Sequence, residues 1–158
     1  MNNYYPQRPV KSFQDLEVYQ RLLAVSVAVA KRISPPRHCE EQSDEAIHPF
    51  SGSPRGYARD DITAKLTVIA LDLPVKIATA HSLRFGDQTR AIEALEEVML
   101  NCNILAVYLE QYRDISNKDI EPEFFAEQIK NLLSVRMKIL HLQNSWKKFA
   151  KEYKEYAK

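Results

Sequence analysis

The C-terminal part of the chain carries a run of basic side chains spaced for a helix. Seven lysines and arginines lie between residues 136 and 158, against two acidic residues, Glu152 and Glu155. Four of the lysines follow one another at steps of 4, 3 and 4, which places them on one helix face. Such a face, with aromatic residues interspersed, can follow a phosphate backbone and offer rings for base stacking. The predicted nucleic-acid-binding residues are Arg136, Lys138, Lys147, Lys148, Lys151, Lys154 and Lys158.

A second interpretation of this basic run is a solvated helix face. Lys148 and Glu152, like Lys151 and Glu155, are four residues apart, the spacing of stabilising ion pairs on a helix. Lysines near a helix C-terminus also interact favourably with the helix dipole. The formal net charge of +1 adds no overall attraction for nucleic acid. The sequence leaves both interpretations open.

No other group of side chains has the pattern of a catalytic or metal site. A cluster of histidine, cysteine and glutamate between residues 38 and 48 matches no common zinc spacing. His81 and His141 have no acidic partner fixed by the sequence, and Cys102 is expected in the core. The sequence also contains no paired carboxylates, nucleophile elbow or phosphate loop, so we expect no metal, no cofactor and no enzymatic activity. The histidine, cysteine and glutamate residues between positions 38 and 48 are His38, Cys39, Glu40, Glu41 and His48.

The composition favours a single all-α domain. The chain has 158 residues, which suits one domain, and only three glycines, all between apolar stretches. In four stretches the apolar residues recur at three- and four-residue steps, the mark of a helix face. This pattern predicts an antiparallel, up-down four-helix bundle. The expected helices span about residues 13–33, 60–84, 88–113 and 121–156.

One predicted connection is much longer than the others. About 25 residues separate Ile33 from Ala58, against the roughly 2–8 expected between bundle helices. They are rich in proline, serine and acidic residues, and the piece RHCEEQSDEAI resembles a peptide encoded by repeat elements in unrelated bacterial proteins. We therefore expect a single domain over residues 1–158, with an insertion at about 37–54 that contributes little to stability.

The second predicted helix is apolar on more than one face. Besides its core stripe it carries Val68, Leu71 and Val75, and only three charged residues lie between Ile62 and Leu83. A helix that is apolar nearly all round is buried on several sides, whereas a helix in a single bundle keeps one face in water. We therefore expect these three residues at a subunit contact of a homo-oligomeric ring. The alternative is a wide core stripe covered by the long loop.

Pro74 lies in the middle of this helix, where a proline costs roughly 3 kcal/mol, and we expect the helix to bend there. The opening SFQDLEVYQRLLAVSVAVAKRISP resembles the start of bacterial four-helix-bundle proteins found in intervening sequences of large-subunit ribosomal RNA genes. Their second helix carries the motif Ser-Ile-Pro-x-Asn-Ile-Ala-Glu-Gly, with which residues 73–80 align. The proline, isoleucine and alanine match, whereas Lys76, Thr79 and Ala80 replace the asparagine, glutamate and glycine.

The stretches EALEEVMLNCNILAVYLEQYRDIS and IKNLL extend this resemblance over nearly the whole chain. The three replacements point to a sister branch, the accessory variability determinant of diversity-generating retroelements. That resemblance implies a homopentamer and a non-enzymatic, nucleic-acid-binding accessory protein that scaffolds a reverse transcriptase and its structured RNA. Resemblance to the ribosomal RNA intervening-sequence branch also implies a pentamer but no firm biochemical activity. The alternative function, which the near-neutral net charge allows, is a protein-interaction bundle of that type with no nucleic-acid role.

The sequence also bears on location. The N-terminal stretch MNNYYPQRPVKSF lacks the apolar core of a signal peptide, and no run of about 18 uncharged apolar residues occurs. Cys39 and Cys102 lie in unlike surroundings and do not suggest a disulfide framework. We therefore expect a cytoplasmic protein without a membrane partner.

Overall fold

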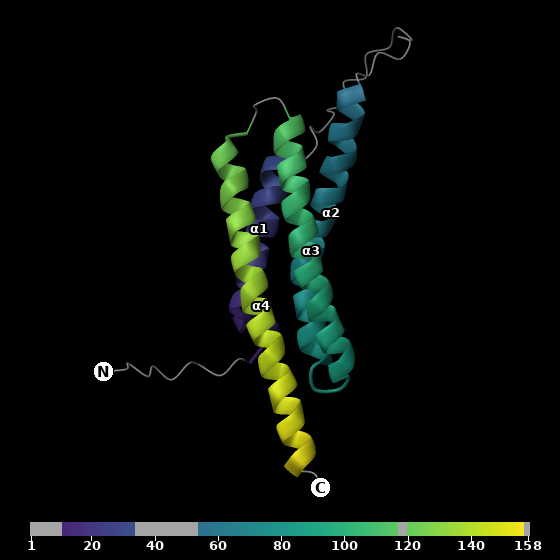
Figure 1. Cartoon of the computed structure of the whole chain (residues 1–158), viewed down its shortest axis with the longest axis vertical. Coiled ribbons are helices and arrows are strands. Elements are labelled where there is room, and N and C mark those ends of the chain that lie inside the picture. Colours follow the sequence, from purple (N-terminus) through teal and green to yellow (C-terminus); the bar gives the residue numbers. More distant parts are fainter. Residues whose placement is uncertain (1–10, 34–53, 117–119, 157–158) are drawn as a thin grey trace, which may run out of the picture.

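The chain folds into long helices that lie side by side along one axis (Figure 1). No strand occurs among the residues that the structure describes, which confirms the all-α prediction. The structure, a computed structural model, describes residues 11–33, 54–116 and 120–156, with the side chains of 54–57, 150 and 152–156 excepted. Its elements are a 3-10 turn η1 (Phe13–Asp15) and the helices α1 (Glu17–Ile33), α2 (Pro54–Leu83), α3 (Gln88–Ile115) and α4 (Pro122–Tyr156).

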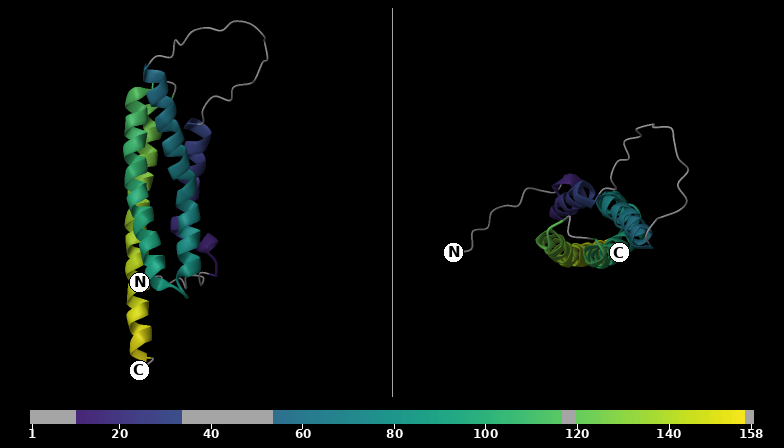
Figure 2. Two further views of the ribbon diagram at one scale, coloured as in Figure 1. Left: turned by 90° about the vertical axis from the view of Figure 1, so that its right-hand side faces the viewer. Right: turned by 90° about the horizontal axis from the view of Figure 1, so that it is seen from above.

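The four helices enclose one hydrophobic core. α1 packs against α2 and α4, and α3 packs against the same two helices, as the view along the axis shows (Figure 2). Phe125 is among the largest fully buried side chains, and its ring lies 6.0 Å from that of Tyr112. Fully burying a large apolar side chain stabilises a fold by about 1.5–3 kcal/mol, so a shared core of this kind holds the helices together. Its fully buried members include Leu22, Leu66, Leu73, Ile77, Leu95, Leu105, Leu109, Leu132 and Ile139.

The first helix begins later than its predicted start at residue 13. The Ser12 hydroxyl accepts a hydrogen bond from the Gln14 N–H at 3.2 Å, and the Asp15 carboxylate accepts one from the Ser12 N–H at 3.0 Å. This capping box stabilises only the single turn η1. After it, Leu16 adopts an extended conformation with its side chain buried. The prediction of one helix from residue 13 is therefore wrong, because the cap belongs to a separate turn and α1 starts at Glu17.

The second helix begins at Pro54, six residues before the predicted start at residue 60. Proline is well suited to the first turn of a helix, since its fixed φ is helical and its missing N–H has no partner there. The sequence prediction assigned Pro54 to the insertion and so placed the boundary too late. Residues 37–53 of the predicted insertion lie outside the described part of the chain. α2 is a single helix that continues through the buried Pro74.

One short connection fixes the end of α2 and the beginning of α3. Between α2 and α3, the Gly86 and Asp87 N–H groups both donate to the Leu83 carbonyl, at 3.1 and 2.9 Å. The Asp87 carboxylate then accepts a hydrogen bond from the Arg90 N–H at 3.1 Å and caps α3, which begins at the predicted residue 88. This tight turn brings Arg84 and Phe85 to one end of the molecule.

α4 is the longest helix, and its last turns extend past the ends of the other three (Figures 1 and 2). We call residues 147–156 of α4 the tail. None of the described helices combines the length and the apolar character needed to span a bilayer.

Candidate nucleic-acid and subunit interfaces

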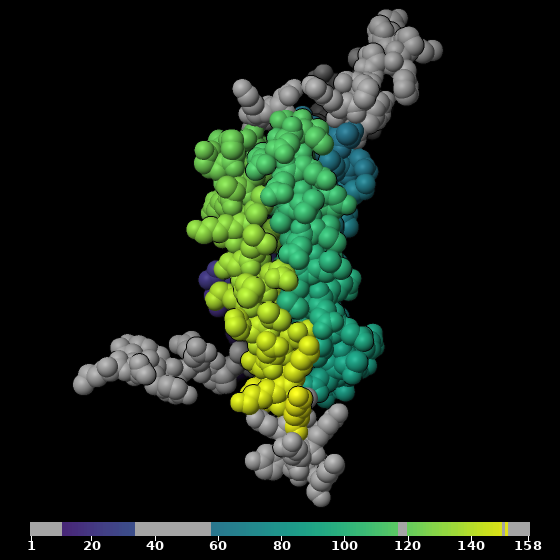
Figure 3. Space-filling view, in the orientation of Figure 1, coloured from purple at the N-terminus to yellow at the C-terminus, as the bar shows by residue number. Residues whose placement is uncertain are grey.

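The tail emerges from a firmly held part of α4. The buried Gln143 side chain donates through Nε2 to the Ile92 carbonyl at 3.3 Å and to the Glu96 carboxylate at 3.0 Å. One turn later, Gln88 Nε2 donates to the Trp146 carbonyl at 2.9 Å. In the space-filling view, this part of α4 lies against the beginning of α3 (Figure 3). The direction in which the tail leaves the bundle is thus fixed by polar contacts to α3.

Two of the predicted nucleic-acid-binding residues are engaged within the bundle. Lys138 Nζ donates to the Glu17 carboxylate of α1 at 3.0 Å, and this hydrogen bond lowers the pKa of Glu17. Arg136 is half-buried, and its Nε is buried without a hydrogen-bond partner in the part of the chain that the structure describes. Both side chains contribute to the packing of α4, and their contact with nucleic acid stays a prediction.

Three of the predicted residues lie on the surface at the start of the tail. Lys147, Lys148 and Lys151 are exposed. Lys147 Nζ is 3.6 Å from the Glu96 carboxylate, but both side chains are about half exposed, and pairs of this kind contribute about 0–1 kcal/mol. A phosphate group can therefore replace Glu96 as the partner of Lys147 at a small cost in free energy. Lys154 and Lys158 lie outside the described side chains.

The second apolar stripe of α2 faces outward. In the single chain Val68 is 67% exposed, Leu71 51% and Val75 59%, so these side chains form no part of its core. The charged Lys76 beside the stripe is neutralised by Asp72, at 3.2 Å, and by Glu97 of α3. The hydrogen bond to Glu97 is the main reason that the pKa of Lys76 is raised. The stripe is therefore an exposed apolar surface whose nearest cation is already paired.

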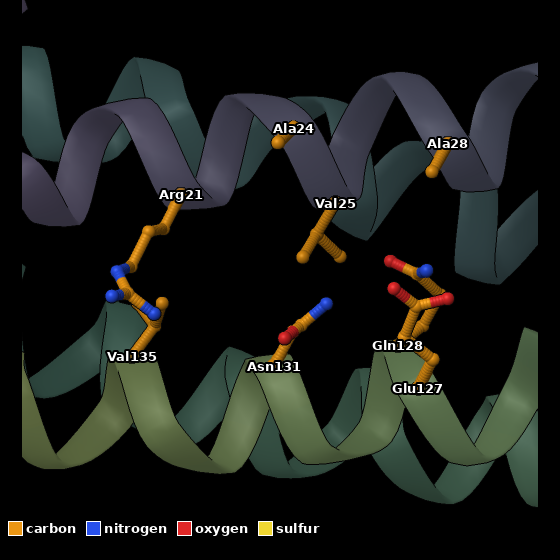
Figure 4. Close-up of a pocket in the computed structure, with 8 residues that line it drawn as sticks. All are labelled: Arg21, Ala24, Val25, Ala28, Glu127, Gln128, Asn131 and Val135. Atoms are coloured by element: carbon orange, nitrogen blue, oxygen red, sulfur yellow. The ribbon is translucent and has the colours of Figure 1, made fainter.

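A groove of about 290 Å³ lies between α1 and α4 (Figure 4). Ala24 and Ala28 leave room on the α1 side, and Asn131 of α4 points towards them across the gap. Arg21, at one end, is already paired with Glu17 at 2.8 Å. The lining brings together no nucleophile with a base and no set of metal ligands, so we assign the groove no chemistry.

The remaining candidates from the sequence have structural surroundings. Cys102 is fully buried, and burial raises the pKa of its thiol to about 12, so it stays protonated and unreactive at neutral pH. His141 is exposed on α4. No group of three or more potential metal ligands occurs among the described residues, and the cluster at residues 38–48 lies outside them.

His81 of α2 is half-buried, and the pKa of its imidazole is lowered. Burial lowers the pKa of its imidazole, the nearby Arg84 lowers it further, and Asp15 opposes the shift. Its Nε2 is buried without a partner within the described residues. The folded protein therefore keeps His81 neutral below the ordinary value of 6.5.

This shift predicts that the protein loses stability in mild acid. Because the pKa of His81 is lower in the folded than in the unfolded chain, the unfolded chain takes up a proton first as the pH falls through 6.5. The free energy of unfolding should therefore fall with decreasing pH until the folded-state pKa is reached. Replacement His81→Gln should flatten this dependence in urea unfolding between about pH 7.5 and 5. With His141→Gln as the control, an unchanged slope in the His81 variant would contradict the assignment.

The structure also brings together Arg84, Phe85 and Trp146, which no spacing within the sequence connects. The Arg84 guanidinium lies over the Phe85 ring, 4.2 Å from its centroid, and 5.9 Å from the centroid of Trp146. Phe85 itself is 84% exposed. The sequence did contain a signal for the exposure of Phe85. This residue lies beside Gly86 in the connection between two predicted helices, where there is no core for the ring to enter. The contact with Trp146 joins two segments far apart in sequence and had no signal of its own.

The exposed lysines, the α2 stripe and the Arg84 cluster are thus the surfaces on which a function can be based. None of them contains a catalytic constellation among the described residues. In comparisons with protein-family models, with curated proteins and with solved structures, none matches the chain.

Proposed function

We propose that this protein is a non-enzymatic nucleic-acid-binding accessory protein of the cytoplasm, similar to the accessory variability determinant, which scaffolds a reverse transcriptase and its RNA. The observation that carries the proposal is the tail, a helical extension anchored at Gln143 and Trp146 with exposed lysines at its start. Lysines on a projecting helix reach phosphates without desolvating the bundle, and each phosphate contact releases condensed counterions.

The proposed architecture is an antiparallel up-down bundle with a bend at Pro74. Two ion pairs between α1 and the α4 segment support the chain directions. Arg32 near the end of α1 is 3.6 Å from Glu121 just before α4, whereas Glu17 at the start of α1 contacts Lys138 farther along α4. The bend follows from the missing N–H of Pro74, which leaves the Ala70 carbonyl without its usual helical donor.

The proposed assembly is a homo-oligomeric ring, with the pentamer that the resemblance implies. A closed ring of more than two copies needs two different surfaces on each subunit. The α2 stripe supplies one of them. Exposed apolar side chains of α3 and α4 are candidates for the second. Several tails in one ring would bind one RNA with avidity. The exposed apolar side chains of α3 and α4 are Leu100, Val107, Leu133 and Met137.

A salt titration tests nucleic-acid binding. We expect the protein to bind a fluorescently labelled structured RNA, with log Kd rising linearly with log salt concentration in an anisotropy assay. Each neutralised phosphate contributes a slope of roughly 0.7–0.9, so contact by three or more lysines gives a slope above about 2. Absence of binding at about 50 mM salt, or binding that is indifferent to salt, would contradict the proposal.

A protein-interaction bundle without a nucleic-acid role is the second candidate. It is favoured by the pairing of Lys138 with Glu17 and of Lys147 with Glu96, and by the net charge of +1. On this alternative the lysines are hydrated surface residues that contact no nucleic acid. A gene for a reverse transcriptase beside that of this protein favours the first candidate, whereas a location within a ribosomal RNA gene favours the second.

A further inference from the structure

Arg84 has no anionic partner among the described residues, unlike Arg32 and Arg113. Arg32 lies 3.6 Å from Glu121, and Arg113 lies 2.9 Å from Asp114. Arg84 forms neither an ion pair nor a hydrogen bond with any residue that the structure describes, and its Nε is buried without a partner. The rings of Phe85 and Trp146, rather than a carboxylate, hold its guanidinium in place. Its terminal N–H donors are thus left for an outside acceptor.

Phe85 is exposed to an unusual degree for an aromatic residue. Its ring is 84% exposed, the highest value among the large exposed apolar side chains of the described chain. One face meets the Arg84 guanidinium at 4.2 Å, so the ring is oriented although it is not buried. An oriented ring in solvent costs free energy in the isolated protein but provides a flat surface on which another planar group can stack.

The exposed lysines at the start of the tail lie close to this turn. Trp146, which faces Arg84, directly precedes Lys147 and Lys148 in α4, and Lys151 follows one turn later. Gln88, two residues after Gly86, holds the Trp146 carbonyl at 2.9 Å and so keeps the two segments together. An aromatic ring, an arginine without a partner and several lysines are therefore gathered at one end of the molecule.

We propose that this end of the molecule binds single-stranded nucleic acid, with a base stacked on Phe85 and the adjoining phosphate accepting hydrogen bonds from Arg84. The inference rests on the proposed function and names the form of nucleic acid that this part of the surface takes. A duplex presents only the edges of its bases along its length, whereas an unpaired base offers a free face to an exposed ring. Sequence preference is weak, because every base can stack.

The test compares binding of two probes to the full-length protein. One is a labelled oligouridylate of about 12 nucleotides, and the other is a duplex RNA of the same length. Replacement Phe85→Leu keeps an apolar side chain and removes the aromatic face. We expect it to weaken oligouridylate binding about 10-fold, to leave the salt slope unchanged, and to change duplex binding less than about 2-fold. Arg84→Gln should weaken oligouridylate binding as well and lower the salt slope by roughly 0.7.

Two matched variants complete the design. Phe124→Leu removes the ring of another arginine–aromatic pair, 5.7 Å from the Arg32 guanidinium near the start of α4, and Lys130→Gln removes an exposed charge on the same helix. Both should bind oligouridylate as the parent does. If Phe85→Leu binds like the parent, or Phe124→Leu loses as much affinity, the stacking site is overturned while the proposed function stands. If the parent binds neither probe, the inference and the proposed function both fail.

Discussion

Replacing Val68, Leu71 and Val75 together by glutamate is expected to convert the assembled protein into a folded monomer of 18.3 kDa. All three side chains are more than half exposed in the single chain, so their replacement removes no core contact. Glutamate is a good helix former, so α2 should keep its helical structure. At a subunit contact, however, three carboxylates would lose water without gaining partners, a penalty of several kcal/mol for each buried charge.

Light scattering coupled to size exclusion at micromolar concentration measures this effect, with circular dichroism as the check on helix content. The matched variant carries Val68→Leu, Leu71→Met and Val75→Leu, which keep the stripe apolar and should keep the assembly. A parent protein that already elutes as a monomer of 18.3 kDa would refute the ring. An oligomer that persists in the glutamate variant would instead move the contact away from the α2 stripe.

The sequence predicts the helices well where a pattern within one helix decides them. The apolar steps of three and four residues identify the core faces, and Asp87 identifies the start of α3. The errors lie at boundaries where two local signals compete. Ser12 caps a separate turn rather than α1, and Pro54 opens a helix rather than closing a loop. Both residues are good start signals, but a start signal does not specify which element follows.

The candidate sites depend on contacts between helices, which spacing within one helix cannot reveal. The lysines of the basic run look alike in sequence, yet Lys138 is bound to Glu17 of α1, more than a hundred residues away. Arg84 and Trp146 meet only because the turn after α2 lies beside the end of α4. By contrast, the exposure of the α2 stripe follows from one helix alone, since the opposite face already fills the core.

The second large effect concerns the tail itself. Changing Lys147, Lys151, Lys154 and Lys158 to glutamine removes the four lysines whose spacing in the sequence predicts one helix face, while glutamine preserves helix propensity. Lys147 and Lys151 are exposed, so the bundle should remain folded. If all four contact phosphates, the slope of log Kd against log salt should become shallower by about 3 for each tail engaged. At about 100 mM salt the affinity should fall by two to three orders of magnitude.

A variant with the same loss of charge distinguishes specific contacts from a change in overall charge. Lys31, Arg32, Arg113 and Lys130 are exposed and lie towards the ends of α1 and α3 and the start of α4, away from the tail. Changing these four to glutamine also lowers the net charge by four but leaves the tail intact. This second variant should keep most of the parent's affinity and nearly all of its salt slope.

The most direct test of the account is therefore the salt dependence of RNA binding, measured side by side for the parent and the two fourfold glutamine variants. The account predicts a steep slope for the parent, a slope close to the parent's for the variant altered away from the tail, and a shallow slope with weak binding for the tail variant. If the tail variant binds RNA as tightly as the parent at every salt concentration, the lysines are hydrated surface residues that do not contact RNA, and the central claim is wrong.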